Sequence, residues 1–385
     1  MSRASNSAQP LDVTPVYALP ARRPSVFGMI VRFVAFLIVL ASFLLNLVLL
    51  AALAYNGGFT SEDSSVREMH YSGTRRAPDK VAIVRIEGVI LEGTLGFVHK
   101  EIEQAAKDSA VKGVVIRINS PGGSVTASDN VHHHLIELRD GNTEKGRAGK
   151  PLIVSMGGLA ASGGYYIAMP ARTLVAERTS LTGSIGVYAA FPNIAELGDK
   201  IGFTMNVIKA GAVKDSGSPF QHMTAKERLL FQDMVDHMYL QFLHVVEEGR
   251  SHLKGKLQDE IAVDESLAIR TDKSKSQDLK FSRYRADGGI FTAEEAAKYG
   301  LIDQIGYLDD AVRLARDAAG ITGSYETVAY EKPRSLLGSL FGDQSDNMKM
   351  RLEPSQLSQA AMPRFWYLAP QSELAGIFSA LSTRP

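Results

Sequence analysis

The sequence contains no cysteine among its 385 residues and only one tryptophan. The missing cysteine excludes disulfides, thiolate metal sites and a thiol nucleophile, so outside the cytoplasm such a chain relies on packing alone. The net charge is also zero, because 42 basic residues balance 42 acidic ones. A neutral chain lacks the basic surface typical of nucleic-acid-binding proteins, and we expect no nucleic-acid partner.

Three consecutive histidines, His132 to His134, are the densest group of potential metal ligands in the sequence. They fall in a predicted helix, where successive side chains project about 100° apart and cannot converge on one ion. A solvated helix face explains them better, and the other histidines lack ligand spacing. We therefore predict no metal site and no cofactor.

One long hydrophobic run, Phe33 to Tyr55, contains no charged residue. It is long enough to cross a bilayer core, which takes about 20 residues. Residues 1–32 are rich in proline and predict a disordered tail. Arginines such as Arg32 precede the run and acidic residues follow it, which predicts a cytoplasmic N-terminus and an extracytoplasmic remainder at the inner membrane.

A cleaved signal peptide is the alternative for this run, because Ala52-Leu53-Ala54 resembles a cleavage site. The apolar region of a signal peptide is shorter, however, at about 7–15 residues. An uncleaved anchor is therefore the favoured interpretation.

The rest of the chain predicts a linker over residues 56–79, an α/β domain over 80–325 and a C-terminal tail over 326–385. Short β-branched runs alternate with helical patterns, a rhythm typical of helices packed on a sheet. The predicted strands are Val81–Ile86, Val114–Ile118, Leu152–Met156, Thr173–Ala176, Val187–Ala190 and Phe203–Ile208.

The stretch after Leu152–Met156 has the features of a nucleophile site. Gly157-Gly158 predicts a tight turn, and Leu159–Ala168 predicts a helix with Ser162 near its start. A hydroxyl there lies beside backbone N–H groups and has no bulky neighbour to block an approaching carbonyl. The alternative is an ordinary helix N-cap serine.

Backbone donors for such a reaction are predicted after the strand that ends at Asn119. Pro121 fixes φ, and the following glycine pair allows the backbone to approach a ligand closely. The N–H groups of Gly123 and Gly163 are then candidates for an oxyanion hole. The alternative is a strand-to-helix loop that needs glycine for its dihedral angles.

Lys214 is the candidate base, in a glycine-containing loop after the predicted strand Phe203–Ile208. A lysine accepts a proton near neutrality only if burial lowers its pKa from about 10.4. Serine–lysine pairs are a known variant of the serine–histidine arrangement. The alternative is a solvated loop lysine.

Four blocks together resemble the signal peptide peptidase A family, membrane-anchored serine proteases related in fold to the Clp protease and crotonase. The resemblance covers about residues 80–320. The matching blocks are Asn119–Ser124, Ala161–Tyr166, Thr182–Val187 and Gly211–Pro219.

This resemblance implies an α/β fold of repeated ββα units and assigns roles to residues. Ser162 would be the nucleophile, Lys214 the base and Ser184 the residue that orients the lysine, with Gly123 and Gly163 as oxyanion donors. It further implies hydrophobic peptide substrates, such as cleaved signal peptides, and a homo-oligomer with active sites shared between protomers. The alternatives are a crotonase-type acyl-thioester enzyme and an inactive membrane scaffold.

Three further features are predicted beyond these blocks. Thr224 and Thr292 each begin a capping box, and the first is followed by an apolar stripe that we expect to be core. A charged insertion spans 257–287 and is predicted to be a surface loop or a subunit contact. The tail contains an aromatic segment predicted to dock on protein or membrane, comprising Phe365, Trp366 and Tyr367.

Overall fold

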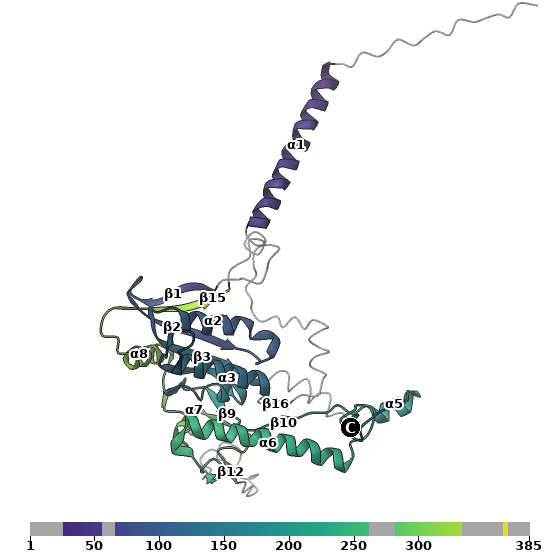
Figure 1. The fold of residues 1–385 in the computed structure, drawn as a ribbon, viewed down its shortest axis with the longest axis vertical. Helices are drawn as coiled ribbons and strands as arrows, with labels where there is room; N and C mark the ends of the chain where they lie inside the picture. The colour runs from purple at the N-terminus through teal and green to yellow at the C-terminus, as the bar shows by residue number, and fades with distance from the viewer. Residues whose placement is uncertain (1–25, 56–65, 262–281, 333–364, 369–385) are drawn as a thin grey trace, which may run out of the picture. The chain divides into compact units, whose positions relative to one another are not determined.

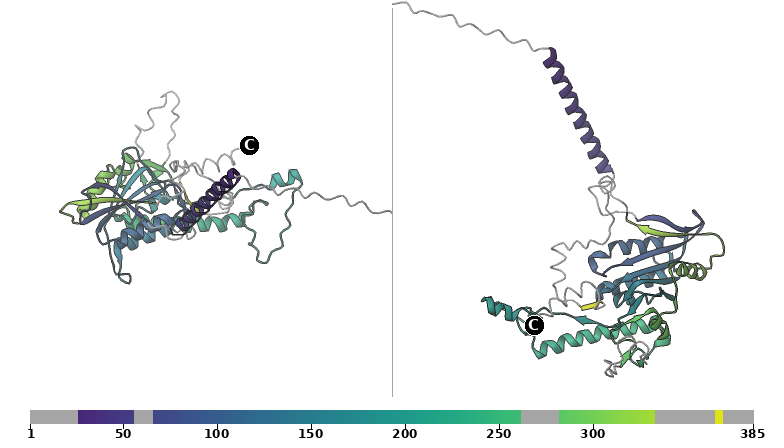
Figure 2. Two further views of the ribbon diagram at one scale, coloured as in Figure 1. Left: turned by 90° about the horizontal axis from the view of Figure 1, so that it is seen from above. Right: turned by 180° about the vertical axis from the view of Figure 1, so that it is seen from behind.

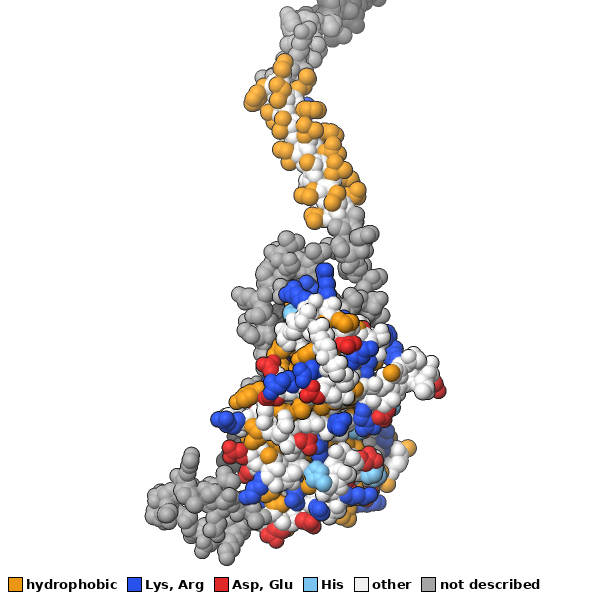
Figure 3. All heavy atoms as spheres, turned by 90° about the vertical axis from the view of Figure 1, so that its left-hand side faces the viewer, with side chains coloured by type: hydrophobic (Ala, Val, Ile, Leu, Met, Phe, Trp, Pro, Cys, Tyr) orange, Lys and Arg blue, Asp and Glu red, His pale blue; other side chains and the backbone are white. Residues whose placement is uncertain are grey.

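The computed structural model describes residues 26–55, 66–261, 282–332 and 365–368, which belong to two units divided between Ser64 and Ser65. The first unit is the helix α1 (Val26–Tyr55), in which Val26–Leu49 is long and apolar enough to cross a membrane. Its large apolar side chains from Val26 to Leu49 are exposed (Figure 3). The helix begins before Phe33, within the predicted tail, because the residues before Arg32 continue the apolar run.

A nine-stranded sheet forms the centre of the second unit (Figure 1). Its main path runs β1-β15-β2-β3-β7-β8-β14, parallel from β15 to β14, with β1 antiparallel at the edge. The predicted α/β class is confirmed. The strands are β1 (Arg67–Gly73), β2 (Asp79–Glu87), β3 (Val111–Ser120), β7 (Leu152–Ala161), β8 (Thr173–Ala176), β9 (Leu181–Gly183), β13 (Ile290–Thr292), β14 (Gln304–Ile305) and β15 (Tyr325–Glu331).

Both faces of this sheet are covered, so its central strands are apolar almost throughout. On β2, Ala82 and Val84 belong to the larger core beneath α2 (Gly96–Lys107) and α3 (Val125–Asp140). Val81 and Ile83 point the other way, into a smaller core with α8 (Leu308–Ala318).

The sheet is larger than the sequence predicted. β1 lies in the predicted linker and most of β15 in the predicted tail, and the two pair with each other at the sheet edge. An edge strand that is exposed on both faces needs no apolar alternation, so β1 carries no hydrophobic pattern.

Both predicted capping boxes are confirmed, at the starts of α6 (Ala225–Gly249) and α7 (Ala293–Lys298). The apolar stripe of α6 is core only near its C-terminal end, where Phe242 is fully buried, whereas Met234 is 45% exposed. The predicted strand Phe203–Ile208 is also wrong, because this segment pairs with no strand in the described part of the chain.

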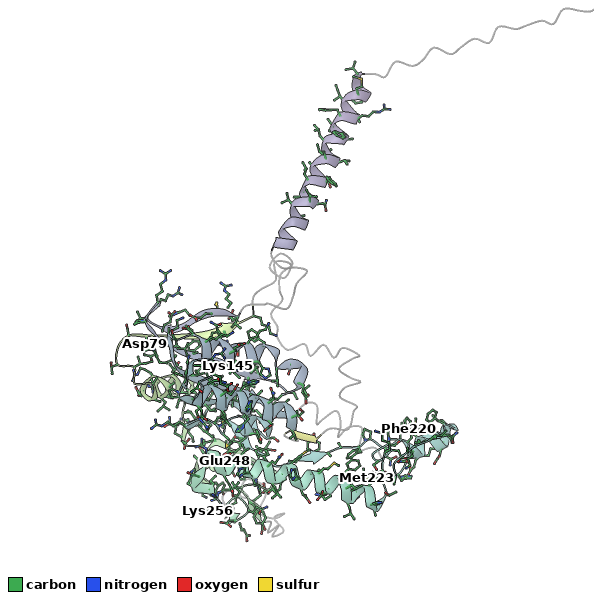
Figure 4. All side chains as sticks on the ribbon, viewed as in Figure 1. Asp79, Lys145, Phe220, Met223, Glu248 and Lys256 are labelled. Atoms are coloured by element: carbon green, nitrogen blue, oxygen red, sulfur yellow. The ribbon has the colours of Figure 1, made fainter. Side chains whose placement is uncertain are left out.

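These exposed segments form one projection, which we call the arm and define as residues 190–235. It contains α5 (Ala195–Ile201) and the first half of α6, and Figures 1 and 2 both show it extending away from the sheet. Figure 4 places Phe220 and Met223 in the arm, far from Asp79 at the sheet. The arm therefore leaves its apolar side chains without a partner from the sheet.

Of the predicted insertion 257–287, residues 262–281 lie outside the described residues. Its two ends pair as two antiparallel strands, β11 (Glu260–Ile261) and β12 (Arg283–Tyr284), with Leu257 and Ile261 buried. The remaining short elements are η1 (Glu92–Thr94), η2 (Ser251–Leu253), α4 (Gly163–Tyr166), β4 (Gly122–Ser124), β5 (Gly141–Asn142), β6 (Arg147–Ala148), β10 (Tyr188–Ala189) and β16 (Phe365–Leu368).

Candidate active site

The strand that leads to Ser162 is longer than predicted. β7 does not turn at Gly157-Gly158 but continues to Ala161, and the helix that follows, α4, starts only at Gly163. Opposite it, Ile118 of β3 pairs with Met156 and Ser120 pairs with Ala160, so Asn119 alone faces residues 157–159. The glycine pair is therefore part of a bulge that bends β7 onto β9.

Side chains from three neighbouring segments hold this bulge. The Leu159 N–H donates to Asn119 Oδ1 at 3.2 Å. On the other side, Ser180 Oγ donates to the Gly157 carbonyl at 2.5 Å and Thr182 Oγ1 to the Ala160 carbonyl at 2.7 Å. Polar groups that an irregular strand would leave unpaired are thus satisfied.

Ser162 occupies an unusual backbone conformation at the end of this strand. Its φ is +53° and its ψ is −117°, values that a residue with a Cβ rarely adopts. Its N–H donates to the Gly183 carbonyl at 2.8 Å, and the residue is only 1% exposed. Ser162 is the N-cap residue of α4, but its hydroxyl makes no capping hydrogen bond.

Gly123 lies in the short strand β4, which is bonded on one side to Ile90. The Ile90 N–H donates to the Gly122 carbonyl at 2.9 Å, and the Ser124 N–H donates to the Ile90 carbonyl at 2.9 Å. Because backbone groups alternate along a strand, the N–H and C=O of Gly123 face the opposite edge. A Cβ on Gly123 would lie 1.9 Å from the Ile90 carbonyl oxygen, so only glycine fits.

Gly163 lies close to this strand, because Cα atoms of α4 and β4 approach within 8 Å. As the first residue of α4, Gly163 has an N–H without an intrahelical acceptor. The next residue, Gly164, packs so closely on β3 that a Cβ would lie 2.8 Å from the Ser120 carbonyl oxygen. The two predicted oxyanion donors therefore come from adjacent, tightly packed elements.

Ser184 is held by residues that the sequence analysis missed. Its φ is +52°, its N–H donates to the Gly289 carbonyl at 2.8 Å, and its hydroxyl donates to the Gly288 carbonyl at 3.1 Å. The available signal was a glycine pair directly after the charged insertion. That insertion thus ends beside the candidate site.

Lys214 is the predicted site residue that a single chain does not bring to Ser162. It is exposed, in a series of turns within the arm, and in the described residues no hydrogen bond or ion pair joins it to Ser162 or Ser184. The neighbouring Lys209 is paired with Asp215 instead.

The predicted solvated helix face is wrong for His132, the first of the three histidines, which is buried. The ring of His132 lies 5.0 Å from that of Tyr166, edge to face. Burial lowers the pKa of His132 to about 4, so this imidazole is neutral at physiological pH. Tyr166 in turn donates to Asp129 Oδ1 at 2.8 Å, which ties α4 to α3.

Comparison with known proteins identifies the protein family to which this chain belongs. The model of peptidase family S49 matches residues 144–279. A putative protease of Synechocystis is 31% identical over 272 residues, covering 70% of this chain and 86% of that protein. The chain belongs to peptidase family S49.

Further relatives agree with this membership in the signal peptide peptidase A family. A putative protease of Methanocaldococcus jannaschii is 35% identical over 239 residues, or 62% of this S49 chain and 66% of that protein. Protease 4 of Haemophilus influenzae is 30% identical over 253 residues, or 64% of this chain and 35% of that protein. The chain thus matches less than two thirds of either relative's length.

One solved structure, a ClpP1 mutant of Listeria monocytogenes, aligns with 60% of the S49 chain and 94% of its own length. The TM-score of that alignment is 0.33 and the sequence identity is 17%.

Proposed function

We propose that this S49 chain is a membrane-anchored serine endopeptidase with Ser162 as its nucleophile. The observation that carries the proposal is the conformation of Ser162, a buried serine at positive φ whose hydroxyl caps nothing. Strain of this kind persists where surrounding structure imposes it, and it is typical of catalytic turns. The bulge of β7 and the Gly183 carbonyl supply that restraint.

The proposed reaction forms an ester between Ser162 Oγ and the substrate carbonyl carbon. The N–H groups of Gly123 and Gly163 stabilise the negative oxygen of the tetrahedral intermediate. Neutral Lys214 takes the hydroxyl proton and passes it to the leaving amine as the peptide bond breaks. Water then hydrolyses the ester by the reverse roles, and Ser184 orients the lysine.

In this proposal Lys214 comes from a neighbouring copy of the chain. The arm that carries it exposes large apolar side chains, including Leu229 at 71% and Ile201 at 70%. Soluble surfaces rarely leave such clusters uncovered, and a second copy is the partner that would bury them. The same contact would desolvate the lysine and favour its neutral form.

The proposed substrates are hydrophobic peptides in extended form, such as cleaved signal peptides. The apolar helix α1 supports a location at a membrane, where such peptides are released. The arginines before α1 support a cytoplasmic N-terminus and an extracytoplasmic catalytic unit.

A fluorophosphonate probe tests the nucleophile directly. The full chain in nanodiscs should be labelled once, at Ser162, and Ser162→Ala should abolish both the labelling and the hydrolysis of a hydrophobic reporter peptide. Ser128→Ala is the matched control, because it also removes one buried hydroxyl, from α3, and should keep both. Undiminished labelling of Ser162→Ala would overturn the assignment.

Lys214→Arg tests the base. The guanidinium stays protonated and cannot accept the serine proton, so we expect hydrolysis to fall about a hundredfold or more while the oligomer remains intact. Lys209→Arg is the control and should stay near wild type, because an arginine can still pair with Asp215. Equal losses in both variants would contradict a specific role for Lys214.

A further inference from the structure

The loop that holds Ser184 is itself held by an ion pair. Asp287 Oδ1 accepts from the Gly289 N–H at 2.8 Å. Asp287 Oδ2 pairs with Arg283 and also accepts from the Tyr284 N–H at 3.3 Å. Only 21% of the Arg283 side chain and 19% of the Asp287 side chain are exposed. The pair therefore fixes the course of the backbone at Gly289.

Arg283 is anchored in turn on β13. Its guanidinium carbon lies 4.5 Å from the centre of the Phe291 ring, in a cation–π contact. Phe291 is 1% exposed and pairs with Thr182 where β13 meets β9. The ring packs so closely on Gly183 that a Cβ there would lie 2.7 Å from it. The ion pair is thus tied to the strand that leads to Ser184.

This loop decides which hydrogen bonds the Ser184 hydroxyl can make. A hydroxyl has one hydrogen to donate and two lone pairs that accept. The Gly288 carbonyl takes that hydrogen at 3.1 Å, and the Gly289 carbonyl holds the Ser184 N–H at 2.8 Å. Towards any further partner, Ser184 Oγ can therefore only accept.

The direction of that hydrogen bond matters for a lysine base. A neutral amine has two N–H donors and one lone pair, and it needs the lone pair for the proton of Ser162. If Ser184 accepts an N–H, the lone pair stays free, whereas a hydroxyl free to rotate would donate to it. We propose that Asp287 is a positioning residue that keeps Ser184 an acceptor for Lys214. The inference rests on the proposed function, because it concerns how Ser184 orients Lys214.

A double-mutant cycle tests this coupling in the full chain in nanodiscs, with a hydrophobic reporter peptide. Asp287→Ala should lower kcat about tenfold and leave KM nearly unchanged, because about one hydrogen bond at the base is lost. In a Ser184→Ala background the same change should cost less than about twofold, since the residue through which it acts is already gone. Equal losses in both backgrounds would overturn the inference.

The pH dependence of kcat/KM distinguishes positioning from general damage. Its rising limb reports the pKa of the base in the free enzyme. Without the acceptor, the ammonium form of Lys214 is less stable, so in Asp287→Ala the midpoint should lie at least about half a pH unit lower. A lower rate with an unchanged midpoint would show that Asp287 is merely structural and would also overturn the inference.

Asp108→Ala is the matched control. Asp108 Oδ1 also accepts from an N–H two residues further on, that of Ala110 at 2.8 Å, and its Oδ2 pairs with Lys80 at 3.1 Å. These contacts lie at the start of β3, whereas the candidate site lies beyond its end. The variant should keep the wild-type kcat and midpoint.

Two further variants make the test independent of how well Asp287→Ala folds. Asp287→Asn keeps an acceptor for Gly289 and should retain at least about a third of the wild-type kcat. Arg283→Met removes the ion pair but keeps an apolar stem on Phe291. It should lower kcat about threefold, and this loss should disappear in the Ser184→Ala background. A loss that persists there would contradict the inference.

Failure of the proposed function would be recognised separately. Fluorophosphonate labelling of the wild type tests Ser162 without reference to Asp287. A Ser184→Ala protein with wild-type kcat would refute the proposed role of Ser184, and the inference with it.

Discussion

At the scale of single residues, the candidate site depends on backbone positions that neighbouring side chains fix. Ser162 and Ser184 both have positive φ, and each is anchored by a carbonyl from another strand or loop. Asn119 contributes most directly, because its amide oxygen accepts from Leu159 within the bulge that precedes Ser162. Asn119 is exposed, so this contact adds more to geometry than to stability.

Asn119→Ala should therefore lower kcat about tenfold, which corresponds to the net value of about one hydrogen bond. Asn119→Asp keeps an acceptor oxygen at the same distance from the backbone and should retain most of the activity. KM and the melting temperature should change little in either variant, as steady-state kinetics and thermal unfolding would show. A matching loss in Asn119→Asp would mean that the contact with Leu159 does not position the nucleophile.

The sequence singled out these residues as candidates but did not predict their backbone geometry. Glycine pairs and a serine after a strand were visible in the pattern, but the bulge was not. It depends on the Asn119 side chain and on Ser180 and Thr182, which lie on other segments. No local pattern around Gly157 contains that information.

At the scale of secondary-structure elements, α2 carries a buried carboxyl group. Glu101 is 1% exposed, and its Oε2 accepts from the Arg85 N–H of β2 at 3.1 Å. Burial raises the pKa of Glu101 to about 8, against 4.5 for the unperturbed group. The folded protein therefore holds a proton that the unfolded chain releases, so this group lowers stability as pH rises from about 4.5 to 8.

Glu101→Gln should remove this dependence, because the amide keeps an acceptor for Arg85 and does not ionise. The variant should match the wild type near pH 5 and exceed it by up to a few kcal/mol at pH 9. Denaturant unfolding of the full chain at both pH values measures the difference in unfolding free energy between the variant and the wild type. A difference between the proteins that stays constant with pH would show that Glu101 does not carry this penalty.

Other elements escaped prediction for a physical reason. β1 is a polar edge strand and is recognisable only through its partner β15. Phe203–Ile208 has the composition of a strand but pairs with no strand among the described residues, and Ile208 is fully exposed. Composition did predict the buried parallel strands, because both faces of these strands are covered and their residues are therefore mostly apolar.

At the scale of the whole molecule, the separation of Lys214 from the Ser162 strand is the main feature. The chain has one copy of each block, and the arm bearing Lys214 extends from the sheet (Figure 1). Sequence reasoning selected these two residues as candidates but did not place the arm, whose large apolar side chains, such as Leu229 and Ile201, stay exposed in the single chain.

Mixing two inactive variants tests this arrangement. Ser162→Ala and Lys214→Ala should each be inactive alone, and co-expression should restore part of the wild-type rate because some interfaces then contain both intact residues. Differently tagged copies and tandem purification would verify mixed oligomers. Verified mixed oligomers without activity would refute an active site shared between protomers. The proposed serine–lysine chemistry would not be affected.

The backbone groups of Gly123 that face the edge of β4 away from Ile90 have a consequence for how the proposed substrates arrive. Gly123 offers only main-chain groups at this edge, so the edge selects chain geometry rather than side chains. A peptide that spans a bilayer is helical, with its backbone groups bonded internally, and freeing each group in lipid costs several kcal/mol. Such a peptide must unwind at the water interface before it can pair with Gly123. We expect that unwinding, rather than amide hydrolysis, to set the pace at which helical peptides are consumed.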